Sequence, residues 1–152
     1  MRWSVDLDVH QGDGTAAIFA GDDSVFTFSM HGAKNFPFHK QRSSLDVELP
    51  DGCRDSEYMA QLERHLPEVL DRARPDIVFF QAGVDPLEGD QLGRLRLSLD
   101  GLRQRDRMVA SAARRGGTPL VLTLGGGYAR PIALSIDAHV GTWREARAAF
   151  GC

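Results

Sequence analysis

The sequence lacks the features that mark membrane-spanning and exported proteins. No run approaches the roughly 20 consecutive apolar residues that cross a bilayer, and no basic segment followed by an apolar stretch opens the chain. Basic residues are not in excess either, because 18 Lys and Arg stand against 21 Asp and Glu without a long basic run. We therefore expect no membrane partner and no direct nucleic-acid partner.

Cysteine is scarce. Cys53 and Cys152 are far apart in the sequence and fit no metal-binding or redox spacing. They are interpreted as reduced bystander thiols of a cytoplasmic protein. The length of 152 residues suits a single domain with a sizeable core, and we expect that domain to cover residues 1–152.

Strand-like and helix-like segments alternate along the chain. Strand patterns occur at Trp3–Asp8, Ser24–Met30, Ile77–Ala82 and Leu120–Leu124. Helical patterns occur at Thr15–Phe19, from Asp55 or Ser56 to about Ala73, at Ser98–Arg115 and at about Pro131–Ala149. This alternation predicts an α/β fold with a parallel sheet flanked by helices. Ligands of such sheets bind beyond the carboxyl ends of the strands.

The first strand and its continuation carry the clearest chemical signal. In the segment VDLDVHQGDG, the polar residues Asp6, Asp8 and His10 alternate with aliphatic residues and would share one face of a strand. Their burial is costly without a counter-charge, which a bound cation supplies. Asp and His together suit zinc or ferrous iron better than calcium or magnesium. The alternative is a strand end whose carboxylates cap a turn and whose imidazole is simply hydrogen-bonded.

Further polar residues follow the other strands. The long loop Gly83–Leu97 contains Asp85 and Asp90, and either carboxylate would complete an open three-ligand site of the catalytic kind. Tyr128 follows three glycines, which let the backbone bring its phenol close to a metal. A plain tight turn or a phosphate-binding turn is the alternative, although LGGGY does not match GxGxxG. Gly12 and Gly14 follow the first strand, and they too are a poor match to a dinucleotide-binding site.

Five segments together resemble the metal-dependent histone deacetylases, most closely the class IV and related bacterial branch. They are DLDVHQGDGTAAIF, VFTFSMHG, NFP, AGVDPLEGDQLGRL and LGGGY, and they follow the family order over nearly the whole chain. The resemblance implies an arginase-like α/β fold. It also implies zinc-dependent hydrolysis of N-acetyl-lysine or other N-acyl-lysine amides, in acylated proteins or in small acylated amines.

The resemblance further implies roles for single residues. Tyr128 matches the tyrosine that stabilises the tetrahedral intermediate, and Phe36 matches an aromatic wall of the acyl-lysine tunnel. Asp6 and Asp13 match the residues that orient two catalytic histidines. The residues that match the zinc ligands of the family are Asp8, His10 and Asp90. Ferrous iron also suits this set of ligands. A monovalent-cation site, usually for potassium, matches Asp6, Asp8, His10, Ser29 and Met30.

One departure from the family concerns proton transfer. Family members carry two adjacent histidines upstream of the DLDVH strand as general base and acid, and this sequence contains no His-His pair. The family domain is also longer, so we expect the C-terminal portion of that domain, with a sheet that is incomplete on its N-terminal side. Two functions follow: a metal-dependent deacetylase, or a non-catalytic metal-binding or interaction module left by truncation. Activity would then require an upstream segment or a partner chain.

Overall fold

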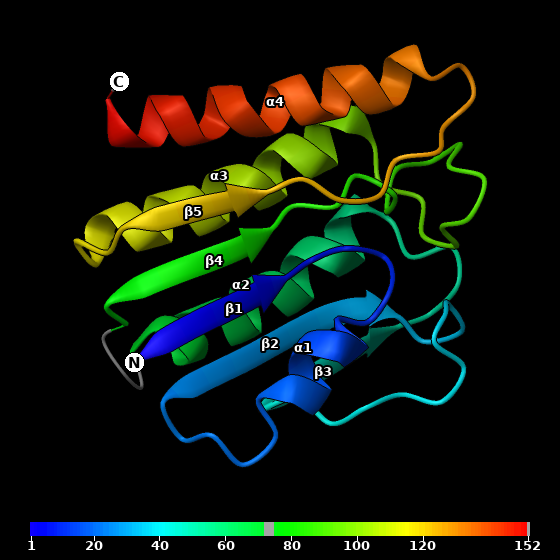
Figure 1. Cartoon of the computed structure of the whole chain (residues 1–152). Coiled ribbons are helices and arrows are strands. Elements are labelled where there is room, and N and C mark those ends of the chain that lie inside the picture. The colour runs from blue at the N-terminus through cyan, green and yellow to red at the C-terminus, as the bar shows by residue number, and fades with distance from the viewer. Residues whose placement is uncertain (72–74, 152) are drawn as a thin grey trace.

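The chain folds around one five-stranded parallel sheet with the strand order β3-β2-β1-β4-β5, as a computed structural model shows (Figure 1). The structure describes residues 1–71 and 75–151. The strands are β1 (Arg2–Asp6), β2 (Val25–Gly32), β3 (Leu45–Leu49), β4 (Ile77–Gln81) and β5 (Leu120–Thr123). The helices are α1 (Asp13–Ile18), α2 (Asp55–Asp71), α3 (Leu99–Arg115) and α4 (Ala133–Phe150). The predicted parallel α/β fold is confirmed.

Two strands differ from the sequence-based prediction. β1 ends at Asp6, so Asp8 and His10 lie in the connection that follows the strand. β3 was not predicted, because a five-residue segment with two acidic residues gives a weak strand signal. The alternation of Leu45, Val47 and Leu49 was the available indication, and the last two side chains are buried. The predicted helix end at Ala73 and the Cys152 thiol lie outside the described residues.

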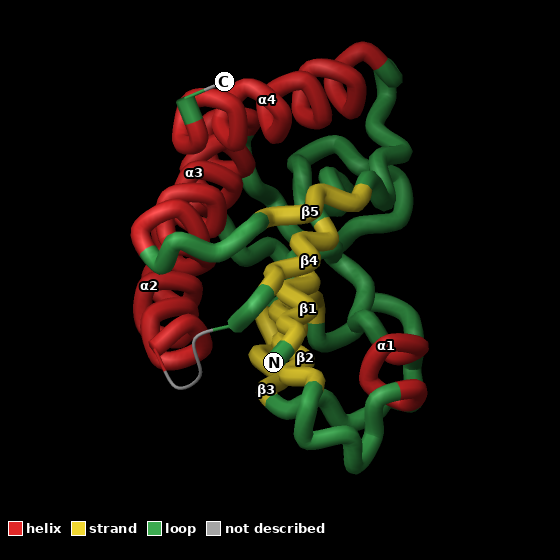
Figure 2. The backbone as a smooth tube through the Cα atoms, turned by 60° about the vertical axis from the view of Figure 1, so that its left-hand side comes forward, coloured by secondary structure: helices red, strands yellow, loops and turns green. Residues whose placement is uncertain are grey.

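The helices cover the two faces of the sheet unequally. α2 and α3 lie on one face, α4 packs on α3, and in the described ranges α1 is the one helix on the opposite face (Figure 2). The α2–α3 face holds the core, which includes the buried side chains of Trp3, Val5 and Phe80. On the opposite face Phe79 is exposed, because a single short helix leaves much of that face uncovered.

The start of α3 is fixed to the start of α2. Ser98 caps α3, and its Oγ accepts a hydrogen bond from the backbone N–H of Gly101 at 2.9 Å. The Asp55 carboxylate, in the first turn of α2, accepts hydrogen bonds from the Ser98 N–H at 2.8 Å and from its hydroxyl at 2.6 Å. The long loop before Ser98 is therefore anchored at its C-terminal end.

Two smaller observations bear on the predictions from composition. Cys53 is buried, and burial raises the pKa of its thiol to about 11, as suits an unreactive side chain. Among the described residues, no helix combines the length and the apolar character that crossing a membrane requires.

Candidate metal centre

The connections that follow β1, β4 and β5 meet at the carboxyl edge of the sheet (Figure 1). Asp8 and His10 come from the first connection, Asp85 from the second, and Gly126 and Tyr128 from the third. These residues line one pocket of about 490 Å³. The prediction that polar residues after separate strands gather at one edge is confirmed for them.

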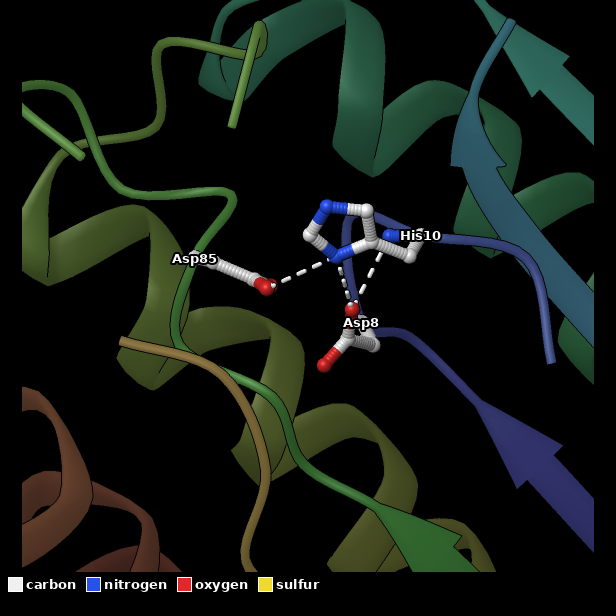
Figure 3. A group of neighbouring side chains, drawn as sticks. All are labelled: Asp8, His10 and Asp85. Atoms are coloured by element: carbon white, nitrogen blue, oxygen red, sulfur yellow. Dashed lines mark hydrogen bonds and ion pairs between the residues drawn. The ribbon is translucent and has the colours of Figure 1, made fainter. Parts of the chain in front are cut away.

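Asp8, His10 and Asp85 form a compact group (Figure 3). One potential ligand atom from each residue lies within 4.8 Å of the other two. The Nδ1 atom of His10 is 3.0 Å from Asp8 Oδ1 and 3.1 Å from Asp85 Oδ2. The second Asp85 oxygen accepts a hydrogen bond from the backbone N–H of Val9 at 2.9 Å, which holds the loop after β4 against the connection after β1.

The charges of this group depend on one another. Hydrogen bonds to Asp8 and Asp85 raise the pKa of His10 to about 10. Burial raises the pKa of Asp85. Burial also acts to raise the pKa of Asp8, but the hydrogen bonds from His10 outweigh it and leave that pKa lowered. A proton on Nδ1 thus occupies the place between two carboxylates where a metal cation would bind.

The residues fit a zinc ion. Two carboxylate oxygens and one imidazole nitrogen form a donor set of the open, three-ligand kind. Two glycines make room for the carboxylates: a Cβ at Gly83 would lie 2.1 Å from Asp8 Oδ2, and one at Gly126 would lie 2.3 Å from Asp85 Oδ2. Gly126 also has a φ of +57°, a conformation that side chains disfavour.

Asp90 lies in the same loop as Asp85 but outside the group. Its Oδ1 accepts hydrogen bonds from the N–H groups of Leu92 and Gly93, both at 2.8 Å. Its Oδ2 accepts a hydrogen bond from the N–H of Tyr128 at 2.6 Å. The structure thus brings Asp85, and not the predicted Asp90, within 4.8 Å of the potential ligand atoms of Asp8 and His10. Asp90 instead connects its own loop to the backbone of Tyr128.

Aromatic side chains form the outer part of the pocket. Phe36 and Tyr128 both line it, as the resemblance implied, and they are 61 % and 53 % exposed. Phe38 lines it too and packs edge-on against Phe36, with ring centroids 6.1 Å apart. The resemblance singled out Phe36 alone, although the sequence Phe-Pro-Phe was a signal for both. One wall of the pocket is therefore open to solvent.

The residues predicted for a monovalent cation are brought together in part. Asp6 and Ser29 are paired in register on β1 and β2, and Asp6 Oδ1 accepts a hydrogen bond from the Asp8 N–H at 3.1 Å. Burial, and then the neighbouring Asp8 charge, raise the pKa of Asp6 to about 7. The Met30 side chain lies in the core, so only its backbone carbonyl is available to a cation.

The residues expected to orient two histidines lie on the less covered side of the sheet. Asp13 is the first residue of α1, and Asp6 lines a cavity of about 450 Å³ together with Thr15. His31 lies within β2 and is buried, so it is not a substitute for a catalytic histidine. The Nε2 atom of His139 in α4 lies 3.4 Å from the backbone oxygen of Gly126, beside the glycine run.

Arg105 of α3 supports the site from behind, and sequence reasoning missed it. Its guanidinium is fully buried, and Nη1 donates hydrogen bonds to the carbonyl oxygens of Leu7 at 3.1 Å and Gly83 at 2.6 Å. Leu7 precedes Asp8, and Gly83 begins the connection that carries Asp85, so one cation binds both ligand-bearing connections. The available signal was a charged residue at a helix position that faces the core.

Comparison with known proteins places these observations in a family context. Residues 3–142 match the model of the histone deacetylase domain. An uncharacterized protein of Picosynechococcus is 50% identical over 143 residues, which cover 94% of this chain and 48% of that protein. Histone deacetylase 2 of Arabidopsis thaliana is 37% identical over 140 residues, which cover 88% of this chain and 36% of that protein. The chain thus spans about half, or less, of the length of these relatives.

The fold also matches solved structures. The crystal structure of acetylpolyamine aminohydrolase from Burkholderia pseudomallei superposes with a TM-score of 0.82 at 20% sequence identity. The match covers 97% of this chain and 45% of that one. At this identity the likeness establishes the arginase-like fold alone.

Proposed function

This chain belongs to the histone deacetylase family, and from that premise we propose that it provides the metal-binding half of a zinc-dependent hydrolase of N-acyl-lysine amides. The observation that carries the proposal is the convergence of His10 Nδ1 with carboxylate oxygens of Asp8 and Asp85 at the base of a pocket lined by aromatic residues. An imidazole and two carboxylates suit zinc or ferrous iron.

Asp8, His10 and Asp85 would hold the metal. When bound, it supplies Lewis acidity, which polarises an amide carbonyl and lowers the pKa of water. The Tyr128 hydroxyl would donate a hydrogen bond to the carbonyl oxygen as negative charge develops there, a contribution of about 3 kcal/mol. The position of Tyr128 in the lining of the pocket supports this role. Asp90 supports this role, because it accepts the hydrogen bond from the Tyr128 backbone.

The pocket suits a flexible aliphatic chain that ends in an amide. The rings of Phe36 and Phe38 would pack against the methylene groups of an acylated lysine or of a small acylated amine. Potassium beside Asp6 and Ser29 is a further part of the proposal. It is supported by the burial of the Asp6 carboxylate next to that of Asp8.

A second candidate function is a non-catalytic metal-binding or interaction module. The absence of a His-His pair from the sequence favours it, because the loss of a general base costs about 10²–10⁴-fold in rate. Turnover by this chain alone would contradict this alternative, provided that a chelator and the substitution His10→Ala both abolish it. The substrates to test are an acetyl-lysine peptide and an acetylated polyamine.

Metal content tests the ligand assignment with a matched pair of carboxylate variants. Purified wild-type chain is expected to bind one zinc ion, Asp85→Asn to lose it, and Asp90→Asn to retain it. The two residues share one loop, so a general disturbance of that loop would affect both variants. Full zinc content in Asp85→Asn would overturn the assignment, and so would loss of zinc from Asp90→Asn alone.

A further inference from the structure

Two cationic side chains line the pocket of the candidate metal centre besides its aromatic residues. They are Lys34 and Arg94, whose side chains are 72% and 51% exposed. Asp8 and Asp85, in contrast, are buried. The two cations therefore belong to the solvent-facing mouth of the pocket, and the two acids belong to its base.

One acid serves both cations of the mouth. Asp51 Oδ2 lies 3.3 Å from Arg94 Nη1 and 3.9 Å from Lys34 Nζ. Among the residues that the structure describes, no second carboxylate forms an ion pair with either cation. Two positive charges thus share one negative charge, and Asp51 is not itself part of the pocket lining. The mouth has an excess of positive charge.

The rest of the pocket does not cancel this excess. A zinc ion at the base would only balance the carboxylates of Asp8 and Asp85. Lys40 lies next to the pocket, because its Nζ donates hydrogen bonds to two backbone carbonyl oxygens of the segment that carries Phe36. Asp90 is a neighbour of opposite sign, since it accepts a hydrogen bond from the backbone of another lining residue. These two neighbours offset each other.

We propose that Lys34 and Arg94 select N-acyl-lysine residues that lie in acidic sequences, and that they exclude acylated polyamines. The inference rests on the proposed function, because the amide must reach the base while the flanking groups of the substrate stay at the mouth. Carboxylates of an acidic peptide would there meet the two cations. An acylated polyamine has further ammonium groups, which the same cations repel.

The same loop contains a matched set of charges away from the pocket. Glu88 Oε1 lies 3.3 Å from Arg96 Nη1 and 3.9 Å from Arg54 Nη2, so here too one acid serves two cations. The Arg96 side chain is 54% exposed, close to the value for Arg94. None of these three residues lines the pocket. They share the charge of the mouth but not its position, and this makes them suitable controls.

Peptide binding to the full chain, incubated with zinc, provides the test. Three fluorescein-labelled peptides contain one acetyl-lysine flanked by glutamates, glutamines or lysines, and fluorescence anisotropy measures their affinities. At low ionic strength we expect the glutamate peptide to bind roughly fivefold more tightly than the glutamine peptide, and the lysine peptide to bind more weakly by a similar factor. High salt should reduce these differences, because exposed charges are screened. A monoacetylated polyamine should compete no better than the lysine peptide.

Substitutions assign the preference to the mouth. Arg94→Gln should weaken binding of the glutamate peptide roughly fivefold and leave the glutamine peptide unchanged. Asp51→Asn removes the acid that the two cations share and should strengthen binding of the glutamate peptide. A gain of affinity of this kind does not arise from misfolding. Arg96→Gln and Glu88→Gln make the same charge changes at the control set and should affect neither peptide.

Equal affinity for the three peptides would overturn the proposal, and so would equal losses in Arg94→Gln and Arg96→Gln. Zinc content and a glutamate peptide with an unmodified lysine separate this inference from the proposed function. A chain that binds zinc and prefers acetylated peptides whatever their flanking charge contradicts the inference alone. A chain that binds no zinc and prefers glutamate peptides with or without the acetyl group contradicts the hydrolase and the inference together.

Discussion

Two groups of buried charged side chains contact the backbone connections that follow β1 and β4. Their charges are neutralised in different ways. In the first group, the Asp106 carboxylate lies 2.8 Å from the guanidinium of Arg105, and both side chains are buried. In the second group, Asp8 and Asp85 share only the ring of His10. The chain itself supplies the cation of the first group, whereas the second carries two acids against one weak base.

The difference indicates what each group does. A buried ion pair completed within the chain fixes structure, and its two members depend on each other. A buried group with more acids than bases has a place for a cation from outside, which a proton occupies when no metal is bound. Arg105 thus belongs to the scaffold that positions Asp8 and Asp85, and His10 belongs to the group in which, under the proposed function, a metal would displace a proton.

The largest effect is expected for Arg105→Met. It leaves Asp106 buried without its cation and the carbonyl oxygens of Leu7 and Gly83 without their donor, a loss of about 3–5 kcal/mol in the free energy of unfolding. Urea denaturation measures it. Arg107→Met is the matched control, because Arg107 pairs with Glu145 at the surface and should cost at most about 1 kcal/mol. Equal losses would contradict the scaffold role.

The second effect concerns zinc affinity as a function of pH. Since the pKa of His10 is raised to about 10, a proton must leave Nδ1 when the metal binds. We expect the affinity to rise about tenfold per pH unit between roughly pH 6.5 and 8.5. Competition with a chromophoric chelator measures it, and His39→Asn, at an exposed histidine, should show the same slope. An affinity that does not change with pH would show that no proton is displaced.

The third effect is on the stability of the metal-free chain. The pKa of His10 is 6.5 ordinarily and about 10 in the folded chain, so its contribution is complete below pH 6.5 and is lost as the pH rises through 10. The expected loss is roughly 2 kcal/mol, because partial exposure of the ring weakens its hydrogen bonds to the carboxylates. Urea denaturation in the presence of a chelator, from pH 6 to 10, should show a slope that His10→Asn removes. A slope retained in that variant would place the titrating group elsewhere.

The smallest effect is expected for Thr142→Val in α4. The Thr142 hydroxyl donates a hydrogen bond to Asp106 Oδ2 at 2.7 Å, and its loss should cost about 1 kcal/mol. Thermal unfolding measures the change. Thr123→Val removes an equally short bond to Gln81 on an exposed strand end and should cost less, because water replaces the lost partner. A larger loss at Thr123 would contradict the importance of burial.

The sequence predicts part of this site and not the rest, for physical reasons. Asp8 and His10 are predictable, because polar residues that interrupt a buried apolar segment need compensation. The third member of the group is not predictable, because Asp85 and Asp90 lie in the same loop. The path of that loop decides which of the two carboxylates reaches the connection after β1. Arg105 is missed because helical periodicity locates apolar faces, and a charge on such a face is recognised only when its acceptors on distant segments are known.

Gly83 and Gly126 determine how closely the carboxylates of Asp8 and Asp85 approach the main chain, since a methyl group at either position would collide with an oxygen. The room for the two carboxylates therefore depends on the absence of a side chain at these two positions. In the proposed centre, an alanine at either glycine would displace a carboxylate without removing it.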